Sequence, residues 1–109
     1  MGNDPPVKPL IDIPKMATKS SDMLKRSLDA LVKRDPALAR QVCEDDDEVD
    51  NLYDLIYKDL IALMIDDPTT IQRATYLMWV AHDLERIADR ATNIAERVIF
   101  LVTGQLVKS

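Results

Sequence analysis

The stretch DDPTTIQRATYLMWVAHDLERIADRATNIAERVIFLVTG, residues 66–104, decides the fold of this chain. It opens on an Asp-Pro pair, in which the aspartate can accept an unpaired backbone N–H and the proline suits the first helical turn. It then runs without glycine or another proline to Gly104, a residue type that commonly ends helices. Apolar residues recur within it every seven positions: Val80, Ile87, Ile94 and Leu101. This pattern predicts one long amphipathic helix from Pro68 to about Thr103.

The same signals divide the preceding sequence into two more helices. A second Asp-Pro pair, at residues 35–36, precedes another glycine-free segment with a seven-residue apolar repeat: Val42, Val49, Ile56 and Leu63. We therefore predict helices over residues 14–33 and about 36–65, and no alternating strand pattern occurs in the sequence. The proline-rich residues 1–13 are expected to form an extended arm, and residues 105–109 a short tail.

Three helices joined by such short turns are expected to run up, down and up beside one another. At 1.5 Å per residue, the second and third helices should each be about 45 to 55 Å long. The predicted fold class is therefore all-α: an elongated antiparallel three-helix bundle over residues 14–104. The heptad spacing predicts left-handed packing like that of coiled coils.

Composition narrows the classes of function. The chain has 109 residues, a net charge of −5 and a sequence pI near 4.7, which suits one small acidic domain. Nucleic acid is an unfavourable partner, because phosphate binding needs a basic surface. No apolar run is long enough to cross a bilayer, so we expect peripheral membrane contact at most. The N-terminus lacks a signal-peptide pattern and Cys43 is the single cysteine, so we expect a cytoplasmic location and a packed, unreactive thiol.

Two acidic pairs with four-residue spacing lie on the two longest predicted helices. Asp46 and Asp50 fall on the second helix, and Glu85 and Asp89 on the third. Asp50 and Glu85 are each about 17 positions from the turn at residues 67–68, while Asp46 and Asp89 are each about 21 positions from it. Antiparallel helices joined by a tight turn bring together residues equally distant from it. The four carboxylates should therefore come level in one interhelical groove.

Carboxylates gathered in one groove repel one another unless they are protonated or neutralised by cations. All-oxygen carboxylate sites suit magnesium, manganese, calcium or iron, and four anionic ligands allow more than one ion. Asn93 and His82 are further candidate ligands or ligand partners on the same helix. The alternative is that the acidic residues are solvated surface charges, with Arg86 forming weak ion pairs to Asp83 or Asp89.

The segment LERIADRATNIAERVIFLVTG, residues 84–104, closely resembles the signature of the PhoU family. Upstream segments are similar to the second repeat of that family: PLIDIPKMA, RDPALARQVCEDDDEVDNLYD and MIDDPTTIQRATYLMWVAHDLERIAD. The resemblance extends from Leu10 to Gly104. It implies a three-helix repeat with a Glu/Asp-x-x-x-Asp motif that holds metal ions, as iron or zinc clusters in some members and magnesium or manganese in others. The residues that match the acidic motif are Asp46, Asp50, Glu85 and Asp89.

The resemblance also implies a regulatory role. PhoU proteins link the phosphate-specific ABC transporter to the sensor histidine kinase of a two-component system, and they dampen phosphate-starvation signalling and uptake. Two residues depart from the family pattern: Arg90 stands where histidine is frequent and adds positive charge, and Ala88 stands where glycine is usual. Only one of the family's two repeats is present, so the sequence is either the C-terminal half of a two-repeat protein or a naturally split version. A lone repeat exposes the face that packs on its sister, so we expect a symmetric homodimer.

Three functions compete for these residues. The first is a metal-binding regulatory protein without catalysis of its own, which contacts the transporter ATPase and the sensor kinase. The second is a helical interaction scaffold whose acidic face docks a basic partner without needing metal. The third, a carboxylate-bridged di-iron oxidoreductase, is poorly supported because the Glu-x-x-His pairs of such sites are absent. Nucleophile-base arrangements lack histidines beyond His82, and the helical body has no glycine-rich phosphate loop.

Overall fold

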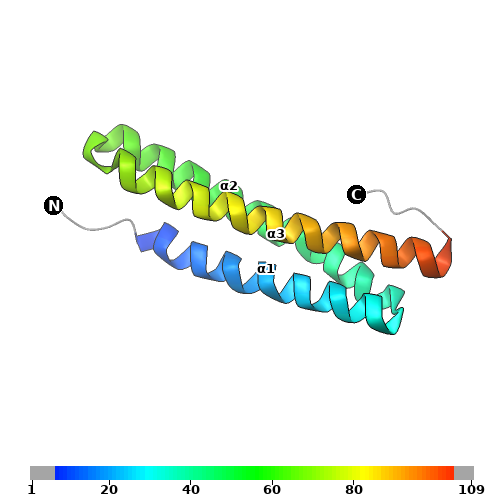
Figure 1. The fold of residues 1–109 in the computed structure, drawn as a ribbon. Helices are drawn as coiled ribbons and strands as arrows, with labels where there is room; N and C mark the ends of the chain where they lie inside the picture. Colours follow the sequence, from blue (N-terminus) through cyan, green and yellow to red (C-terminus); the bar gives the residue numbers. More distant parts are fainter. Residues whose placement is uncertain (1–6, 105–109) are drawn as a thin grey trace.

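Three long helices make up the described part of the chain. The computed structural model describes the backbone of residues 7–104 and the side chains of residues 11–104. Its elements are α1, Val7–Lys33; α2, Pro36–Asp66; the short 3-10 turn η1, Pro68–Thr70; and α3, Ile71–Thr103. Helix α2 runs antiparallel to α1 and α3 (Figure 1), and the bundle measures 55 × 20 × 16 Å. No strand occurs in residues 7–104, so the predicted all-α, elongated up-down-up bundle is confirmed.

The breaks between helices lie where the two Asp-Pro pairs predicted them. Asp35 caps α2, because its Oδ1 accepts a hydrogen bond from Leu38 N at 3.2 Å. Asp67 accepts a similar hydrogen bond from Thr69 N at 3.1 Å. This second cap begins η1 and not the long helix, so α3 starts at Ile71, three residues later than predicted.

The C-terminal end of α3 also follows the prediction. Gly104 adopts a left-handed conformation, with a φ of 73°, and donates its N–H to Phe100 O at 2.8 Å. The predicted tail at residues 105–109 and the first six residues of the predicted arm lie outside the described residues. No helix in the described ranges is long and apolar enough to span a membrane.

The predicted extended arm over residues 1–13 is wrong where the structure describes it, because α1 begins at Val7. Pro14 lies inside the helix, where it cannot donate the backbone hydrogen bond of a regular turn. Its neighbours are nevertheless tightly packed, with Asp12 5% exposed and Met16 0% exposed. The free energy gained by burying this face against the other helices outweighs the loss of one hydrogen bond. The prolines in the sequence do not reveal that burial, which is why the arm was predicted to be extended.

The core combines small residues of α3 with larger residues of α1 and α2. Its largest fully buried apolar side chains from α1 and α2 are Met16, Met23, Val42, Val49, Ile56 and Leu60. Helix α3 contributes a row of alanines one heptad apart: Ala74, Ala81, Ala88 and Ala95. The predicted apolar row of α3 lies at the edge of this core, and its last member, Leu101, is 71% exposed. Small residues on the central face of α3 allow the neighbouring helices to approach closely.

The three grooves between the helices differ in chemistry. In the α1–α2 groove, Lys19 pairs with Glu48 and Arg26 pairs with Asp45. The α2–α3 groove carries the acidic pairs. The α1–α3 groove ends in an open pocket, lined by four apolar side chains and one arginine, at the C-terminal ends of both helices. Each groove therefore offers a different kind of surface to a ligand or partner.

Candidate metal site in the acidic groove

Four carboxylates from α2 and α3 share one groove, which we call the acidic groove: Asp46, Asp50, Glu85 and Asp89. Burial, followed by the charges of Asp50 and Asp89, raises the pKa of Asp46 to about 6. Burial and then Asp89 raise the pKa of Asp50. Burial, Asp89 and Asp50 in that order raise the pKa of Glu85. In each case a carboxylate on the opposite helix is among the causes, as expected if the two pairs lie level.

Asp46 carries a buried oxygen atom that no hydrogen bond satisfies. Its neighbours one turn away on α2, Val42 and Val49, are fully buried, and its own Oδ1 has no hydrogen-bond partner. Thr92 partly opposes the rise in the pKa of Asp46 through hydrogen bonding, but its hydroxyl donates to Ala88 O at 3.1 Å. A hydroxyl carries one proton and cannot supply both acceptors at once. The Asp46 carboxylate is therefore suited to accept a cation.

The acidic run EDDDE of α2 is divided between two faces of the helix. Asp45 and Glu48 pair with Arg26 and Lys19 of α1. Asp46 instead faces α3, where it senses the charge of another carboxylate. Consecutive helical residues are about 100° apart, which is why neighbours in this run reach different helices. Only part of the run is therefore accounted for by ordinary ion pairing.

The arginines of α3 leave the acidic groove uncompensated. Among residues 11–104, no ion pair within 4.0 Å joins Arg86 or Arg90 to a carboxylate. The alternative in which Arg86 pairs with Asp83 or Asp89 is therefore wrong for the described structure. The negative charge of the groove can therefore be neutralised by protons or by cations from solution.

The acidic side chains are neighbours, but they do not form a closed coordination sphere. Within the described side chains, no group of three or more His, Cys, Asp or Glu residues is placed to hold a metal ion. Asp50 and Asp89 are exposed, whereas Asp46 and Glu85 are half-buried. Shared ligation of one ion would require the exposed carboxylates to change rotamer, which their freedom at the surface allows. The donor set and the unpartnered oxygen of Asp46 fit a cation, and metal ligation itself remains a prediction.

Two ring side chains border the acidic groove. His82 is exposed, its ring centroid lies 6.4 Å from that of Tyr53, and its charge opposes the rise in the pKa of Glu85. Tyr53 was not among the functional residues predicted from the sequence. Burial and then the charge of Glu85 raise the pKa of its hydroxyl, so this group stays a neutral donor beside the carboxylates. Its spacing of three residues from Asp50 was the available signal. The other predicted auxiliary ligand, Asn93, is exposed.

Cys43 lies one turn before Asp46 and is half-buried. Burial, followed by the charges of Glu96, Asp46 and Glu44, raises the pKa of its thiol. A raised thiol pKa disfavours the thiolate, which is the form that attacks electrophiles and binds metals. Half-burial and the raised pKa agree with the expectation of a packed thiol, and the low reactivity of Cys43 stays a prediction.

Similarity to known proteins extends along nearly the whole chain. The chain is 39% identical over 105 residues to the phosphate-specific transport system accessory protein PhoU homolog 2 of Thermotoga maritima, which covers 96% of this chain and 45% of that protein. The PhoU homolog of Clostridium acetobutylicum is 42% identical over 96 residues, covering 88% of this chain and 44% of that protein. The PhoU homolog of Aquifex aeolicus is 39% identical over 108 residues, covering 99% and 49% respectively.

The chain thus spans about half the length of these relatives. Residues 13–98 match the model of the PhoU domain. This match includes all four residues of the acidic groove, as well as most of each helix. Because the domain match covers most of the sequence and the relatives align along nearly all of it, this chain belongs to the PhoU domain family.

Proposed function

We propose that this chain is a metal-binding regulatory protein of phosphate uptake and phosphate-starvation signalling, without catalysis of its own. Its relatives are named as accessory proteins of the phosphate-specific transport system, which supports a role beside a transporter. In this proposal the protein is cytoplasmic and acts by contact with the ATPase of the phosphate ABC transporter and with a sensor histidine kinase. Binding or loss of a cation would change the charge of a contact surface, and the acidic groove is such a surface.

The closeness of carboxylates across the acidic groove carries this proposal, because charges on the opposite helix help to raise the pKa of Asp46, Asp50 and Glu85. The half-buried Asp46 and Glu85 would be the inner ligands, with the exposed Asp50 and Asp89 adding further oxygen atoms. Oxygen donors suit magnesium, manganese and iron, while zinc more often takes nitrogen and sulfur ligands. One or more such ions would supply the positive charge that the groove lacks, and would replace repulsion between α2 and α3 with attraction.

Metal content tests the site. In the groove variant, each of the four acids is replaced by its amide, which keeps the shape and removes the charge. In the control variant, Asp45→Asn and Glu48→Gln remove the same kind of charge from the α1 side of the same helix. After purification without chelator, we expect manganese or iron in the wild type and the control, and little in the groove variant. Equal metal content in all three proteins would contradict the proposed site.

A homodimer is part of the proposal, because α3 exposes aromatic residues that a second copy could cover. Tyr76 and Trp79 of α3 are 66% and 69% exposed, and exposed aromatic residues are typical of interfaces. Trp79 is the only tryptophan in the sequence, so its fluorescence reports directly on this surface. We expect its emission to shift with protein concentration, and sedimentation to show a dimer that Trp79→Ala weakens. A monomer at all concentrations would contradict the dimer and leave the acidic groove unaffected.

The exposure of Asp50 and Asp89 favours a second candidate function, in which the acidic groove docks a basic surface of a partner without metal. Binding of the purified transporter ATPase distinguishes the two candidates. Docking by charge alone weakens with added salt and is insensitive to chelator, since exposed ion pairs are screened. Docking through a metal-loaded groove is lost with chelator and is restored by adding manganese.

A further inference from the structure

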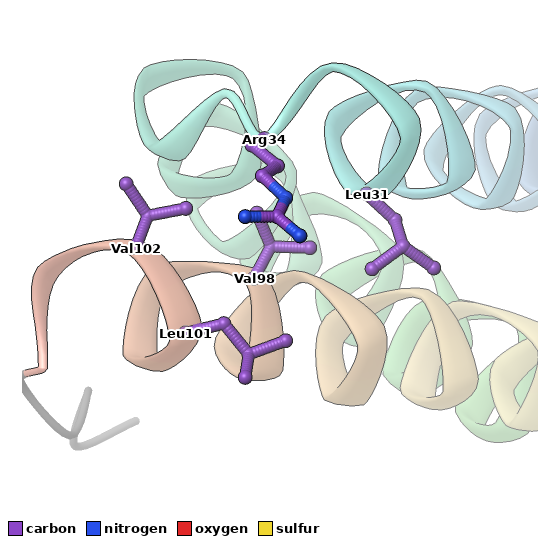
Figure 2. A pocket seen from close by; sticks show the side chains of 5 residues that line it. All are labelled: Leu31, Arg34, Val98, Leu101 and Val102. Carbon is purple, nitrogen blue, oxygen red and sulfur yellow. The ribbon is translucent and has the colours of Figure 1, made fainter.

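A pocket opens between the C-terminal ends of α1 and α3, outside the acidic groove (Figure 2). Its volume is about 400 Å³, and it is lined by Leu31, Arg34, Val98, Leu101 and Val102. Val98 is only 1% exposed, whereas Leu31 and Leu101 are 43% and 71% exposed. Pockets for small molecules span about 300 to 1,000 Å³, so this one suits one or two side chains of a partner. Its apolar walls have no cover in the described structure.

Arg34 holds a backbone conformation that is unfavourable for its residue type. Its φ of 52° is the only positive φ of a non-glycine residue in the described backbone. It follows α1 in a helix-ending turn in which Asp35 N donates to Ala30 O at 3.0 Å, a position where glycine is common. The end of α3 has glycine in the equivalent role, at Gly104. An arginine here costs about 1 kcal/mol relative to glycine, and local strain of this kind often accompanies a function of the side chain.

The Arg34 guanidinium has no acidic partner within the described side chains. No carboxylate of residues 11–104 lies within 4.0 Å of it. Figure 2 shows its side chain extending from the turn after α1 towards α3, with Leu31 on one side and Val102 on the other. The pocket therefore combines apolar walls with one unpaired positive charge at its rim.

We propose that this pocket docks an acidic amphipathic helix of a partner protein. A leucine or similar side chain of that helix enters between Leu31 and Leu101, and a Glu or Asp one turn away pairs with Arg34. One turn is the spacing at which two helical side chains lie on the same face. A single guanidinium is too little charge for a nucleic acid. The same pocket in a second copy would bring arginine against arginine.

The proposal is independent of the metal site, because no residue of the pocket belongs to the acidic groove. Two acetylated and amidated peptides test it, both built on a Leu/Ala amphipathic pattern, with Glu at the polar positions of one and Lys at those of the other. Methyl-labelled Leu and Val residues report on the pocket by NMR. We expect the Glu peptide to shift the methyl signals of Leu31, Val98, Leu101 and Val102 in a saturable way. The Lys peptide, which the acidic faces of the protein attract elsewhere, should leave them unchanged.

Substitutions then test whether the charge of Arg34 contributes to peptide binding. Arg34→Gln should weaken binding of the Glu peptide about fivefold, in line with an exposed ion pair, and Arg34→Lys should restore part of the loss. Arg90→Gln is the matched control, since Arg90 is also exposed and unpaired in the described structure but does not line the pocket. The proposal is overturned if the Glu peptide leaves the pocket methyls unshifted, if both peptides shift them equally, or if Arg34→Gln binds as the wild type does. Pocket shifts that depend on protein concentration alone would identify a second copy as the occupant and also overturn it.

Discussion

Neutralising Asp46 should stabilise the metal-free protein. Burial and the charges of three other carboxylates raise the pKa of Asp46 from 3.8 to about 6, a difference of about two. A pKa difference of one corresponds to about 1.36 kcal/mol, so ionised Asp46 destabilises the folded state at pH 7 by at most about 3 kcal/mol. The side chain keeps contact with water, and screening reduces this value. We therefore expect Asp46→Asn to raise the free energy of unfolding at pH 7 by about 1 to 2 kcal/mol.

The stability gain of Asp46→Asn over the wild type should decrease as the pH falls. Above pH 6, Asp46 is ionised in both the folded and the unfolded state, and the folded state carries the full electrostatic cost. As the pH falls from about 6 to about 4, the folded state takes up a proton that the unfolded state does not, so the wild type gains stability. Asp46→Asn lacks this proton. Its advantage over the wild type should shrink through this window and disappear near pH 4.

Urea denaturation followed by circular dichroism, in chelator and at several pH values from 4 to 7, measures the difference. Asp45→Asn is the control, because Asp45 precedes Asp46 in sequence but pairs with Arg26. That substitution should lower the free energy of unfolding by a few tenths of a kcal/mol up to about 1 kcal/mol at pH 7. If Asp46→Asn destabilises at pH 7, or if its effect is the same at both ends of the pH range, Asp46 does not lie in an uncompensated acidic groove.

Four further substitutions test buried hydroxyl groups, backbone strain and helix capping by urea denaturation. Ser20 and Ser27 are both 0% exposed and lie one heptad apart. Of the two, only Ser27 has a hydrogen bond, in which its Oγ donates to Leu24 O at 2.7 Å. Ser20→Ala should therefore stabilise the fold by about 1 kcal/mol more than Ser27→Ala. Equal effects would show that the Ser20 hydroxyl is satisfied in solution. Arg34→Gly should stabilise by about 0.5 to 1 kcal/mol by relieving the positive φ, and a loss of stability would argue against strain there. Asp35→Ala should destabilise by about 1 kcal/mol through loss of the α2 cap, and no change would mean that water replaces it.

The start of α2 and the end of α3 were predictable because they depend on short-range chemistry. Asp35 accepts a hydrogen bond from a backbone N–H three residues away, and Gly104 takes the left-handed conformation that other residues avoid. The start of α1 was not predictable in this way. Pro14 is a local signal against a helix, but the burial of Met16 and Asp12 depends on residues far away in sequence. Packing against the other two helices decides that boundary.

The core face of α3 is a second feature that hydrophobicity alone did not predict. Two heptad rows, one of larger apolar residues ending at Leu101 and one of alanines that includes Ala81 and Ala88, lie close together around the helix. Hydrophobicity favours the first row as the core, but the structure buries the second. In a bundle of three long helices, the centre has little room, and alanine allows the backbones to approach. The larger residues then flank the core, which leaves an apolar edge beside α1 and the pocket at its end.

The sequence predicted that the four acids of the groove lie at the same level along the helices. It did not predict which acids of α2 form ion pairs with α1. Height depends only on the rise of a helix and on the shortness of the turn, so counting from the turn brings Asp46 level with Asp89. Which acids of the run are paired depends on the rotation of α2 about its axis, which the buried Val42 and Val49 set. With that rotation, Asp45 pairs with a cation of α1, whereas Asp46 faces another carboxylate.

This division has a mechanical consequence for the proposed function. The α1–α2 interface is joined by the protein's own ion pairs, whereas no ion pair within residues 11–104 joins α2 to α3. A cation in the acidic groove would therefore strengthen one interface of the bundle and leave the other unchanged. Loss of that cation would restore repulsion between α2 and α3 while α1 stays attached to α2 through Arg26 and Lys19. A partner that contacts both α2 and α3 could then distinguish the loaded from the empty protein without any change in the rest of the fold.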